Sequence, residues 1–540
     1  MPLGAQFAQE LNSALRLRRM KEGLRLLADA EAEITQLSPR TPGAASLLLL
    51  IAQWVDVGFR DYRLVDNLLQ RFPAGCRKKL LVEDYLRLRM TEAFRDLAAS
   101  EIDSAIETLD TVVKMAREFP DTADAALAHF WKGRAHRKKG EYEASLKHII
   151  QARELAQADH DEIFTAVIQI QESWLLFQKG MAKEAVQILD RAESILKSTD
   201  HYVALGNIES ARGRIVRRSG EYARALEHFS RAAEIYARRD PNHVNLARTL
   251  VNAAYVMRLL ALQLRKRIDI QAHAGRSRHG ASTEPKTAGE NPLARYQRLS
   301  QEAVDALTRA REIYALHAHL DGIGNVVLNL GYLHLDRGDI ERATQEAIEA
   351  YSIGLNKNDH ILMARARILQ AAIENAHVEE QTGEDVDVAV HANQARQYSE
   401  EALRLAESTQ NRRLLAGACI ARGMTAANDF FQDWDIARRY ATQATGLIGP
   451  GENDHLVEDL TSLKSKVVQA SGINDMLRGW SEGIVGNKTF QQITEEFAEI
   501  VIPKVWIRED RKISRVATSL SISPKKVRRI LRNSGSFGRP

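Results

Sequence analysis

The sequence is poor in the residues that mark disulfide-rich, zinc-binding and sheet-rich proteins. Its 540 residues include 2 cysteines, 12 prolines and 6% aromatic residues. Cys76 and Cys419 are far apart and have no neighbouring Cys or His at metal-ligand spacing, which argues against a disulfide scaffold and a zinc site. No run of alternating apolar residues is long enough for a sheet, so the composition predicts an all-α protein.

Long apolar runs and leader patterns are also missing. The most apolar stretch, residues 47–52, is far too short to span a membrane, and the N-terminus has no charged-then-apolar signal pattern. The low cysteine content favours a reducing compartment. We therefore expect a cytoplasmic protein that makes no membrane contact.

Recognisable catalytic motifs are absent as well. No serine, cysteine or threonine lies in a nucleophile motif, and residues 483–489 end like a phosphate-binding loop without its glycine spacing or a preceding strand. His317 and His319 lie beside Asp321, but at a predicted turn, where solvent exposure is the better interpretation. We expect no enzymatic activity, no cofactor and no metal.

What the sequence does contain is a repeat of small residues. Ala93, Gly133, Ser173, Gly213 and Ala253 follow one another at a strict period of 40. Small side chains at fixed offsets let antiparallel helices approach closely. A matching set of small residues lies twelve positions after the first four, at Ala105, Ser145, Ala185 and Ala225, and glycines mark the expected hairpin turns at Gly140, Gly180, Gly220 and Gly338.

This pattern resembles the tetratricopeptide (TPR) family, although the usual period of that family is about 34 residues. The resemblance implies an α-α superhelix of helical hairpins over residues 81–470, with its ligand groove on the first helix of each pair. The register resumes after two insertions, near 268–294 and 379–390, of which the longer is polar and expected to be disordered. Residues 1–80 are interpreted as two degenerate hairpins, and 456–470 as a closing helix.

A different pattern occupies the C-terminal end, after a hinge predicted at 471–487. Within residues 512–533, apolar positions fall on one face of each of two short helices. Between them, Ser523 suits the N-cap and Pro524 the first position of the second helix. Residues 504–540 contain eleven Lys or Arg and two acidic residues. This end therefore has a net charge of +9, and the rest of the chain has a net charge of −5.

The C-terminal pattern resembles the Fis-type helix-turn-helix (factor for inversion stimulation) of bacterial transcription regulators, over residues 489–535 within a domain placed at 488–540. Residues 493–508 would form its preceding helix, which Pro503 is expected to kink or break. Ser521 replaces the glycine common in the turn, which implies a left-handed serine strained by about 1 kcal/mol. The DNA-binding side chains implied are Lys512, Arg515, Ser523, Lys525, Lys526, Arg528, Arg529 and Arg532.

The family's ligand-facing positions can be transferred to the solenoid by register. They place basic residues on either side of an aromatic group, an arrangement suited to a peptide or protein ligand with acidic groups and one apolar anchor. Each arginine has the alternative of covering the neighbouring helix and keeping the groove soluble. The groove residues are Phe130, Arg134, Arg137, Lys138, Trp174, Phe177, Arg214, Arg217, Arg218, Asn325, Tyr332 and Asn375.

Together these features predict a TPR-like solenoid joined to a DNA-binding domain, acting as a homodimeric transcription regulator that binds duplex DNA. One recognition helix makes few contacts, which is why a dimer is expected. The first alternative is an interaction scaffold whose basic tail docks an acidic protein. A second alternative is RNA binding, because the groove is basic as well as the tail.

Overall fold

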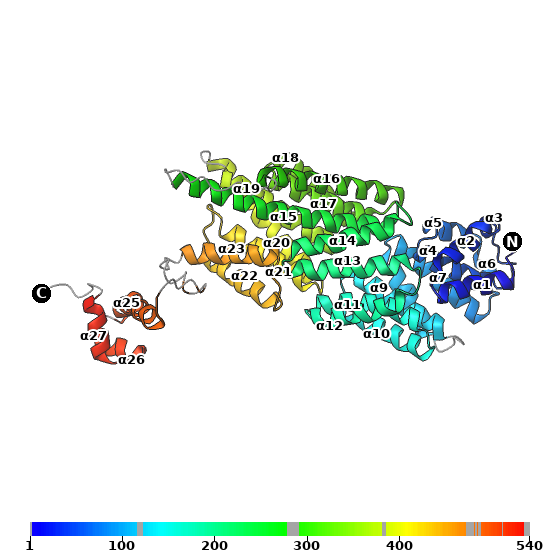
Figure 1. Cartoon of the computed structure of the whole chain (residues 1–540), viewed down its shortest axis with the longest axis horizontal. Helices are drawn as coiled ribbons and strands as arrows, with labels where there is room; N and C mark the ends of the chain where they lie inside the picture. Colours follow the sequence, from blue (N-terminus) through cyan, green and yellow to red (C-terminus); the bar gives the residue numbers. More distant parts are fainter. Residues whose placement is uncertain are drawn as a thin grey trace. The chain divides into compact units, whose positions relative to one another are not determined.

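The computed structural model describes residues 3–115, 122–277, 291–380, 385–470, 480, 483, 488–509 and 511–533. The chain divides into two compact units, residues 1–464 and 465–540. Each unit is described by itself. Every regular element in the described ranges is a helix, which confirms the all-α prediction (Figure 1).

The first unit is a series of antiparallel helical hairpins. Each hairpin packs on the next, so that the apolar core lies between neighbouring pairs, as in a solenoid. Their helices are α7 (Val82–Ala98), α8 (Ile102–Lys114), α9 (Thr122–Lys139), α10 (Tyr142–Ala158), α11 (Glu162–Gln178), α12 (Ala182–Leu196), α13 (Tyr202–Arg218), α14 (Tyr222–Ala237), α15 (Val244–Ser277), α16 (Pro292–Leu316), α17 (Leu320–Asp336), α18 (Ile340–Asn356), α19 (His360–Glu380), α20 (Asp385–Glu407), α21 (Arg412–Ala426), α22 (Trp434–Leu447) and α23 (His455–Ala470).

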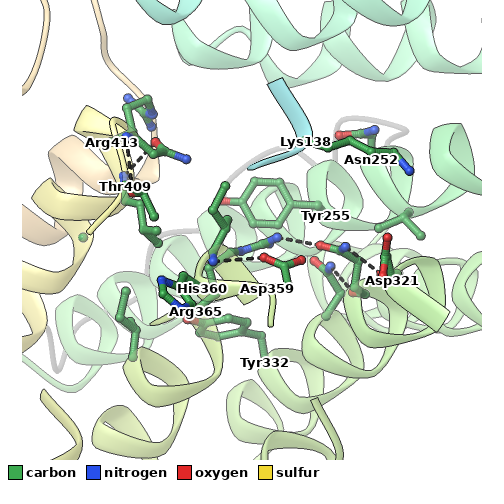
Figure 2. A pocket seen from close by; sticks show the side chains of 18 of the residues that line it. Lys138, Asn252, Tyr255, Asp321, Tyr332, Asp359, His360, Arg365, Thr409 and Arg413 are labelled. Atoms are coloured by element: carbon green, nitrogen blue, oxygen red, sulfur yellow. Dashed lines mark hydrogen bonds between the residues drawn. The ribbon is translucent and has the colours of Figure 1, made fainter. Parts of the chain in front are cut away.

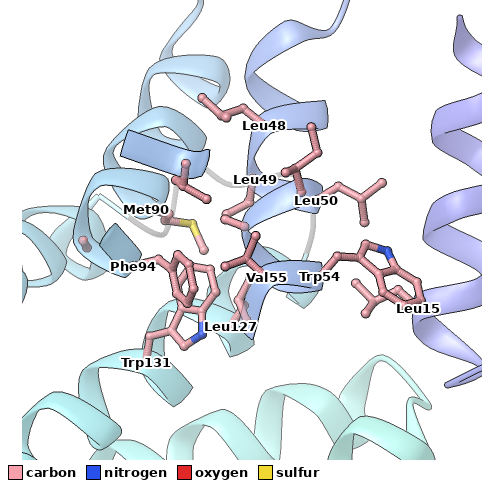
Figure 3. Close-up of a cluster of buried hydrophobic side chains, with 14 of the residues drawn as sticks. Leu15, Leu48, Leu49, Leu50, Trp54, Val55, Met90, Phe94, Leu127 and Trp131 are labelled. Atoms are coloured by element: carbon pink, nitrogen blue, oxygen red, sulfur yellow. The ribbon is translucent and has the colours of Figure 1, made fainter. Parts of the chain in front are cut away.

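Shorter helices cover the N-terminal end of this series. Figure 3 shows the apolar cluster that attaches them, in which Trp54 and Leu50 of α4 (Ala44–Asp56) lie between Leu15 of α1 (Ala5–Arg16) and the aromatic residues of α7 and α9. The fully buried ring of Trp54 packs against Gly23 in the second of the short helices, so it joins α4 to the N-terminal end of the chain. The short helices are α1 (Ala5–Arg16), α2 (Met20–Asp29), α3 (Glu31–Ile34), α4 (Ala44–Asp56), α5 (Arg63–Leu69) and α6 (Ala74–Arg77).

The period of 40 corresponds to helix crossings at which the side chain is small or absent. At Gly133, an added Cβ would lie 2.8 Å from the Ile149 side chain of the partner helix. At Gly213, it would lie 2.8 Å from the ring of Phe229, which is fully buried. The Ser145 hydroxyl also donates a 2.7 Å hydrogen bond to the Gly133 carbonyl. The small residues therefore permit the close packing that the sequence predicted.

The predicted turn glycines have left-handed backbones. Gly140, Gly180, Gly220 and Gly338 have φ values of +89°, +88°, +84° and +80°. Residues with a side chain rarely adopt a positive φ. Glycine adopts it freely, so the first helix of each pair can end and the second can begin within a few residues. The glycines therefore predicted the hairpin turns correctly.

Both predicted insertions are partly helical in the structure, which corrects the expectation of disorder over 268–294. α15 continues to Ser277 and α16 begins at Pro292, where the Asn291 side chain caps the helix by accepting from the Leu293 amide at 3.0 Å. α19 continues to Glu380, and α20 begins at Asp385. Residues 278–290 and 381–384 lie outside the described ranges.

The second unit contains α25 (Phe490–Arg508), α26 (Ile513–Ser519) and α27 (Pro524–Asn533). Its core contains Ile502 and Val505 of α25, together with apolar residues of both short helices. α25 confirms the preceding helix predicted over residues 493–508. The break expected at Pro503 does not occur, and the helix continues to Arg508. Of the hinge predicted at 471–487, only Trp480 and Gly483 are described, and the rest lies outside.

No helix in the described ranges is long and apolar enough to cross a membrane. Within the same residues, His, Cys, Asp and Glu side chains form no group of three that could hold a metal ion.

Candidate functional site

A cavity of about 1350 Å³ lies inside the first unit. Its principal polar and aromatic lining comes from the first helices of successive hairpins, α9, α11, α13, α15, α17, α19 and α21. Figure 2 shows Lys138 and Asn252 on one side of the pocket and Thr409 and Arg413 on the other, with Tyr255 between them.

Contacts between distant turns enclose this cavity. The Gln410 amide donates to the Gly140 carbonyl at 3.3 Å, and the Asn453 amide donates to the Arg218 carbonyl at 2.9 Å. Lys357 also forms an ion pair with Glu101 at 3.0 Å. The superhelix therefore brings its early and late hairpins together around a common interior.

Nine of the twelve predicted groove residues line this cavity. They lie on five different first helices, so the structure brings together side chains separated by more than two hundred positions in sequence. They are Arg137, Lys138, Trp174, Arg214, Arg217, Arg218, Asn325, Tyr332 and Asn375.

The other three predicted groove residues are used in packing. The Arg134 guanidinium pairs with Asp56 of α4 and lies 5.5 Å from the centre of the Phe130 ring. Phe130 is 6% exposed, and Phe177 is 4% exposed beneath the guanidinium of Arg218. These side chains support the lining and are not part of it.

Register transfer missed several lining cations. Arg258 lies five residues after Ala253, as Lys138 lies five after Gly133 and Arg218 five after Gly213, so continuing the register would have found it. Arg248 lies outside that register, and Arg365 and Arg413 belong to later hairpins. Only the closure of the superhelix reveals that they share one cavity.

On one side of the cavity, the cations have acidic or amide partners. Arg258 forms an ion pair with Asp336 at 2.5 Å, and Arg413 pairs with Asp454 at 2.5 Å and also with Glu452. Arg365 donates to the Asn325 side-chain carbonyl at 2.6 Å. This side of the cavity is therefore held together by its own polar contacts.

Burial changes the ionisation of several lining groups. It lowers the pKa of Arg218 to about 9, with the Arg413 charge acting in the same direction. Burial also lowers the pKa of His319 to about 4 and raises the pKa of Tyr332 to about 12, so both are neutral near pH 7. The cavity's charge at that pH comes from its cations and carboxylates.

The predicted peptide-binding amides are engaged within the protein. Besides accepting from Arg365, Asn325 donates to the Asp321 carbonyl at 2.9 Å. Asn375 donates to the Thr425 hydroxyl at 2.9 Å and accepts from the Asn428 amide at 3.1 Å.

In the second unit, the predicted DNA-binding cations lie on the surface. The outward face of α27 is strongly basic, while Val527, Ile530 and Leu531 on its other face are buried. Arg529 also forms an ion pair with Glu495 of α25 at 3.1 Å. The exposed predicted residues are Lys512, Arg515, Ser523, Lys525, Lys526, Arg528, Arg529 and Arg532.

The turn before α27 has the predicted local geometry. Ser521 has a left-handed φ of 51°, and the Ser523 hydroxyl accepts from the Lys526 amide at 3.2 Å as the N-cap of α27. Pro524 is the first residue of that helix.

No protein-family model and no curated protein sequence matches this chain. Among solved structures, a Rap protein complexed with competence and sporulation factor matches with a TM-score of 0.50 and 11% identity, over 79% of this chain and 99% of that one. The apo quorum sensor NprR from B. thuringiensis matches at 0.42 and 14%, over 82% and 97%. A monomeric IFIT1 mutant with Gppp-AAAA matches at 0.44 and 14%, over 82% and 90%. The chain thus has the fold of a TPR-like helical solenoid.

Proposed function

We propose that this protein is a transcription regulator whose second unit binds duplex DNA and whose solenoid cavity binds an anionic ligand. The observation that carries the DNA-binding half is the two-sided character of α27. Its apolar side is packed against α25 and α26, so Lys525, Lys526 and Arg528 can only face outward. A short helix that presents several cations in this way suits phosphate contact and base reading in the major groove.

The turn geometry supports a Fis-type helix-turn-helix. The second helix begins at Pro524, after the N-cap Ser523. The residue with a left-handed backbone is Ser521, at the position where that family commonly has glycine. Because one such helix makes few base contacts, the proposal includes a homodimer with two half-sites. Sedimentation of the protein as a monomer only, with and without DNA, would remove the dimer from the proposal.

The ligand half rests on the charge of the cavity. The Rap structure of similar fold contains the competence and sporulation factor, but for this chain the ligand is inferred from its own side chains. An excess of cations in an enclosed space favours an anionic ligand. Ligand binding would shift the solenoid between conformations and thereby alter the fit of two recognition helices to their half-sites.

Selection of bound sequences from random duplex DNA tests the DNA-binding half. We expect the full-length protein to enrich a motif, and the variant K525A/K526A/R528A to lose it. The matched control, K147A/K183A/K197A, removes the same charge from exposed positions of the first unit and should keep the motif. Salt-sensitive binding without a motif would instead favour the scaffold or RNA-binding alternative, because base discrimination requires specific readout.

A further inference from the structure

Several of the cations that line the cavity form no ion pair with a carboxylate in the part of the chain that the structure describes, and four of them belong to three of the first helices. Arg137 and Lys138 of α9, Arg214 of α13 and Arg248 of α15 all line it, and within the described residues none has a carboxylate at ion-pair distance. These four residues are called the cation cluster. Their hydrogen-bond partners are uncharged: Lys138 donates to the Leu97 carbonyl at 3.0 Å and Arg214 to the Ser210 carbonyl at 3.3 Å. The buried Nε of Arg137 has no partner at all.

The members of the cation cluster are close enough to repel one another. Burial lowers the pKa of Arg137 to about 9, and Arg248, Arg134 and Arg214 lower it further. Burial also lowers the pKa of Arg214 to about 10, again with Arg248 as the foremost charged neighbour. Arg137, Arg214 and Arg248 all line the same cavity, so charges from three helices face one enclosed space. Such concentrated charge destabilises the empty protein and favours an anion.

An aromatic pair holds the Arg137 guanidinium group in place. Arg137 lies 5.1 Å from the centre of the Trp174 ring, and Tyr142 meets the same ring edge-on at 5.3 Å. A cation over an indole is attracted by the ring's electrons, so its position is fixed before any ligand arrives. Trp174 therefore positions a cation, and does not offer its whole surface to an apolar side chain of a peptide.

An extended acidic peptide fits this arrangement poorly. Successive side chains of an extended chain point to opposite sides, about 3.3 Å apart along the chain, so neighbouring carboxylates cannot meet the same converging cations. A peptide also needs partners for its backbone, whereas Asn325 and Asn375 already bond within the protein. A compact group with several charged oxygens can contact several members of the cation cluster at once.

We propose that the cation cluster binds a small molecule containing two adjacent phosphoryl groups, with the rest of the molecule in the remaining cavity. Phosphoryl oxygens point in several directions, so guanidinium groups from α9, α13 and α15 can each donate to them, in part bidentately. This inference rests on the proposed ligand function of the cavity and specifies its chemistry. The cavity volume, about 1350 Å³, leaves room for a larger group beyond the diphosphate.

Calorimetric titration of the full-length protein tests this proposal. Inorganic diphosphate should bind at least tenfold more tightly than inorganic phosphate or tetraglutamate. A nucleoside diphosphate should compete with it for the same site, and tighter binding of the nucleotide would identify an esterified diphosphate as the better ligand.

The variant R214Q/R248Q should weaken diphosphate binding at least tenfold. It removes repelling charges and should fold, and R214K/R248K retains charge without the planar fork and should bind with intermediate affinity. The variant K147A/K183A/K197A removes three cations from exposed positions of the first unit and should bind diphosphate as the native protein does.

Two results would overturn the proposal: diphosphate binding that is absent or unaffected by R214Q/R248Q, or tighter binding of tetraglutamate than of diphosphate. Either result leaves DNA selection as an independent test. Failure of this inference can therefore be distinguished from failure of the DNA-binding proposal.

Discussion

Single glycines determine how closely the paired helices of the solenoid pack. A Cβ at Gly213 would lie 2.8 Å from the buried ring of Phe229, whereas at the exposed Gly446 of α22 nothing lies within 4 Å. We expect G213A to lower the free energy of unfolding by about 1–3 kcal/mol, because the ring cannot move aside. G446A should raise it by up to about 1 kcal/mol through helix propensity. Chemical denaturation of both variants measures the difference, and equal effects would show that the crossing tolerates a methyl group.

Lys138 makes the stability of the protein depend on pH. Burial lowers its pKa from 10.5 to about 8; Asp321 opposes this shift, while Arg248 adds to it. Between these values the unfolded chain holds a proton that the folded protein has released, so stability rises with pH across this window. K138M should remove this part of the rise between pH 7.5 and 9.5 in urea denaturation. K147M, at an exposed position, should keep it, and an unchanged pH dependence in K138M would contradict the assignment.

The lining residues show how far sequence reasoning reaches. A fixed offset from Gly133 and Gly213 found Lys138 and Arg218, because equivalent positions in successive hairpins face the same interior. The same rule selected Phe177, whose ring lies under a guanidinium instead of facing the cavity. Register predicts the face of a helix, but the neighbouring helix decides whether a side chain on that face reaches open space.

The turn between α26 and α27 is the element on which presentation of the basic helix depends. Ser521 adopts a φ of 51°, which glycine adopts without a steric penalty. S521G should therefore stabilise the second unit by about 1 kcal/mol. S514G, in the first turn of α26, should destabilise it by about 0.5–1 kcal/mol. Amide hydrogen exchange in α27 of the full-length protein reports both, and faster exchange in S521G would contradict the expected relief of strain.

Pro503 and the insertions mark where element prediction fell short. Proline removes one backbone donor and disfavours a helix interior. The packing of Ile502 and Val505 in the core of the second unit nevertheless holds α25 together on both sides of it. Similarly, α15 extends to Ser277 beyond the repeat pattern, since helix propagation adds one hydrogen bond for each further residue. A local sequence pattern shows neither the core packing around Pro503 nor the continuation of a helix beyond its repeat.

Enclosure of the cavity by the superhelix could not be predicted from periodicity. Each repeat contributes a small rotation, and only their sum decides whether early and late hairpins meet. The meeting points are backbone contacts such as Gln410 to Gly140 and Asn453 to Arg218, which carry no sequence signature. Sequence thus predicted a basic groove, and the three-dimensional path of the chain turned it into a cavity with a partly uncompensated charge.

The electrostatic contribution of the second unit to DNA affinity should be measurable as a salt dependence. Each cation that neutralises a phosphate releases counterions, so the slope of log affinity against log salt should fall by about 0.9 for each contact removed. We expect this decrease for K525A, K526A and R528A taken singly, measured by fluorescence anisotropy on the selected DNA. K147A should leave the slope unchanged. An unchanged slope in all three variants would show that α27 does not face the phosphates.

Control by a ligand requires that ligand binding in the first unit changes the DNA affinity of the second. Variants of the cation cluster allow this coupling to be measured separately from ligand binding itself. In the native protein, saturating diphosphate should change the affinity for the selected DNA by about 5–150-fold, the usual range of coupling between sites. In R214Q/R248Q the affinity for DNA without ligand should persist, while the effect of diphosphate disappears. Because linkage is reciprocal, saturating DNA must change the native protein's affinity for diphosphate by the same factor. Anisotropy with and without diphosphate measures the first factor, and calorimetry with and without DNA measures the second. Diphosphate binding with both factors equal to one would mean that the cavity is occupied without regulating DNA binding, since a ligand with equal affinity for two conformations cannot shift their populations.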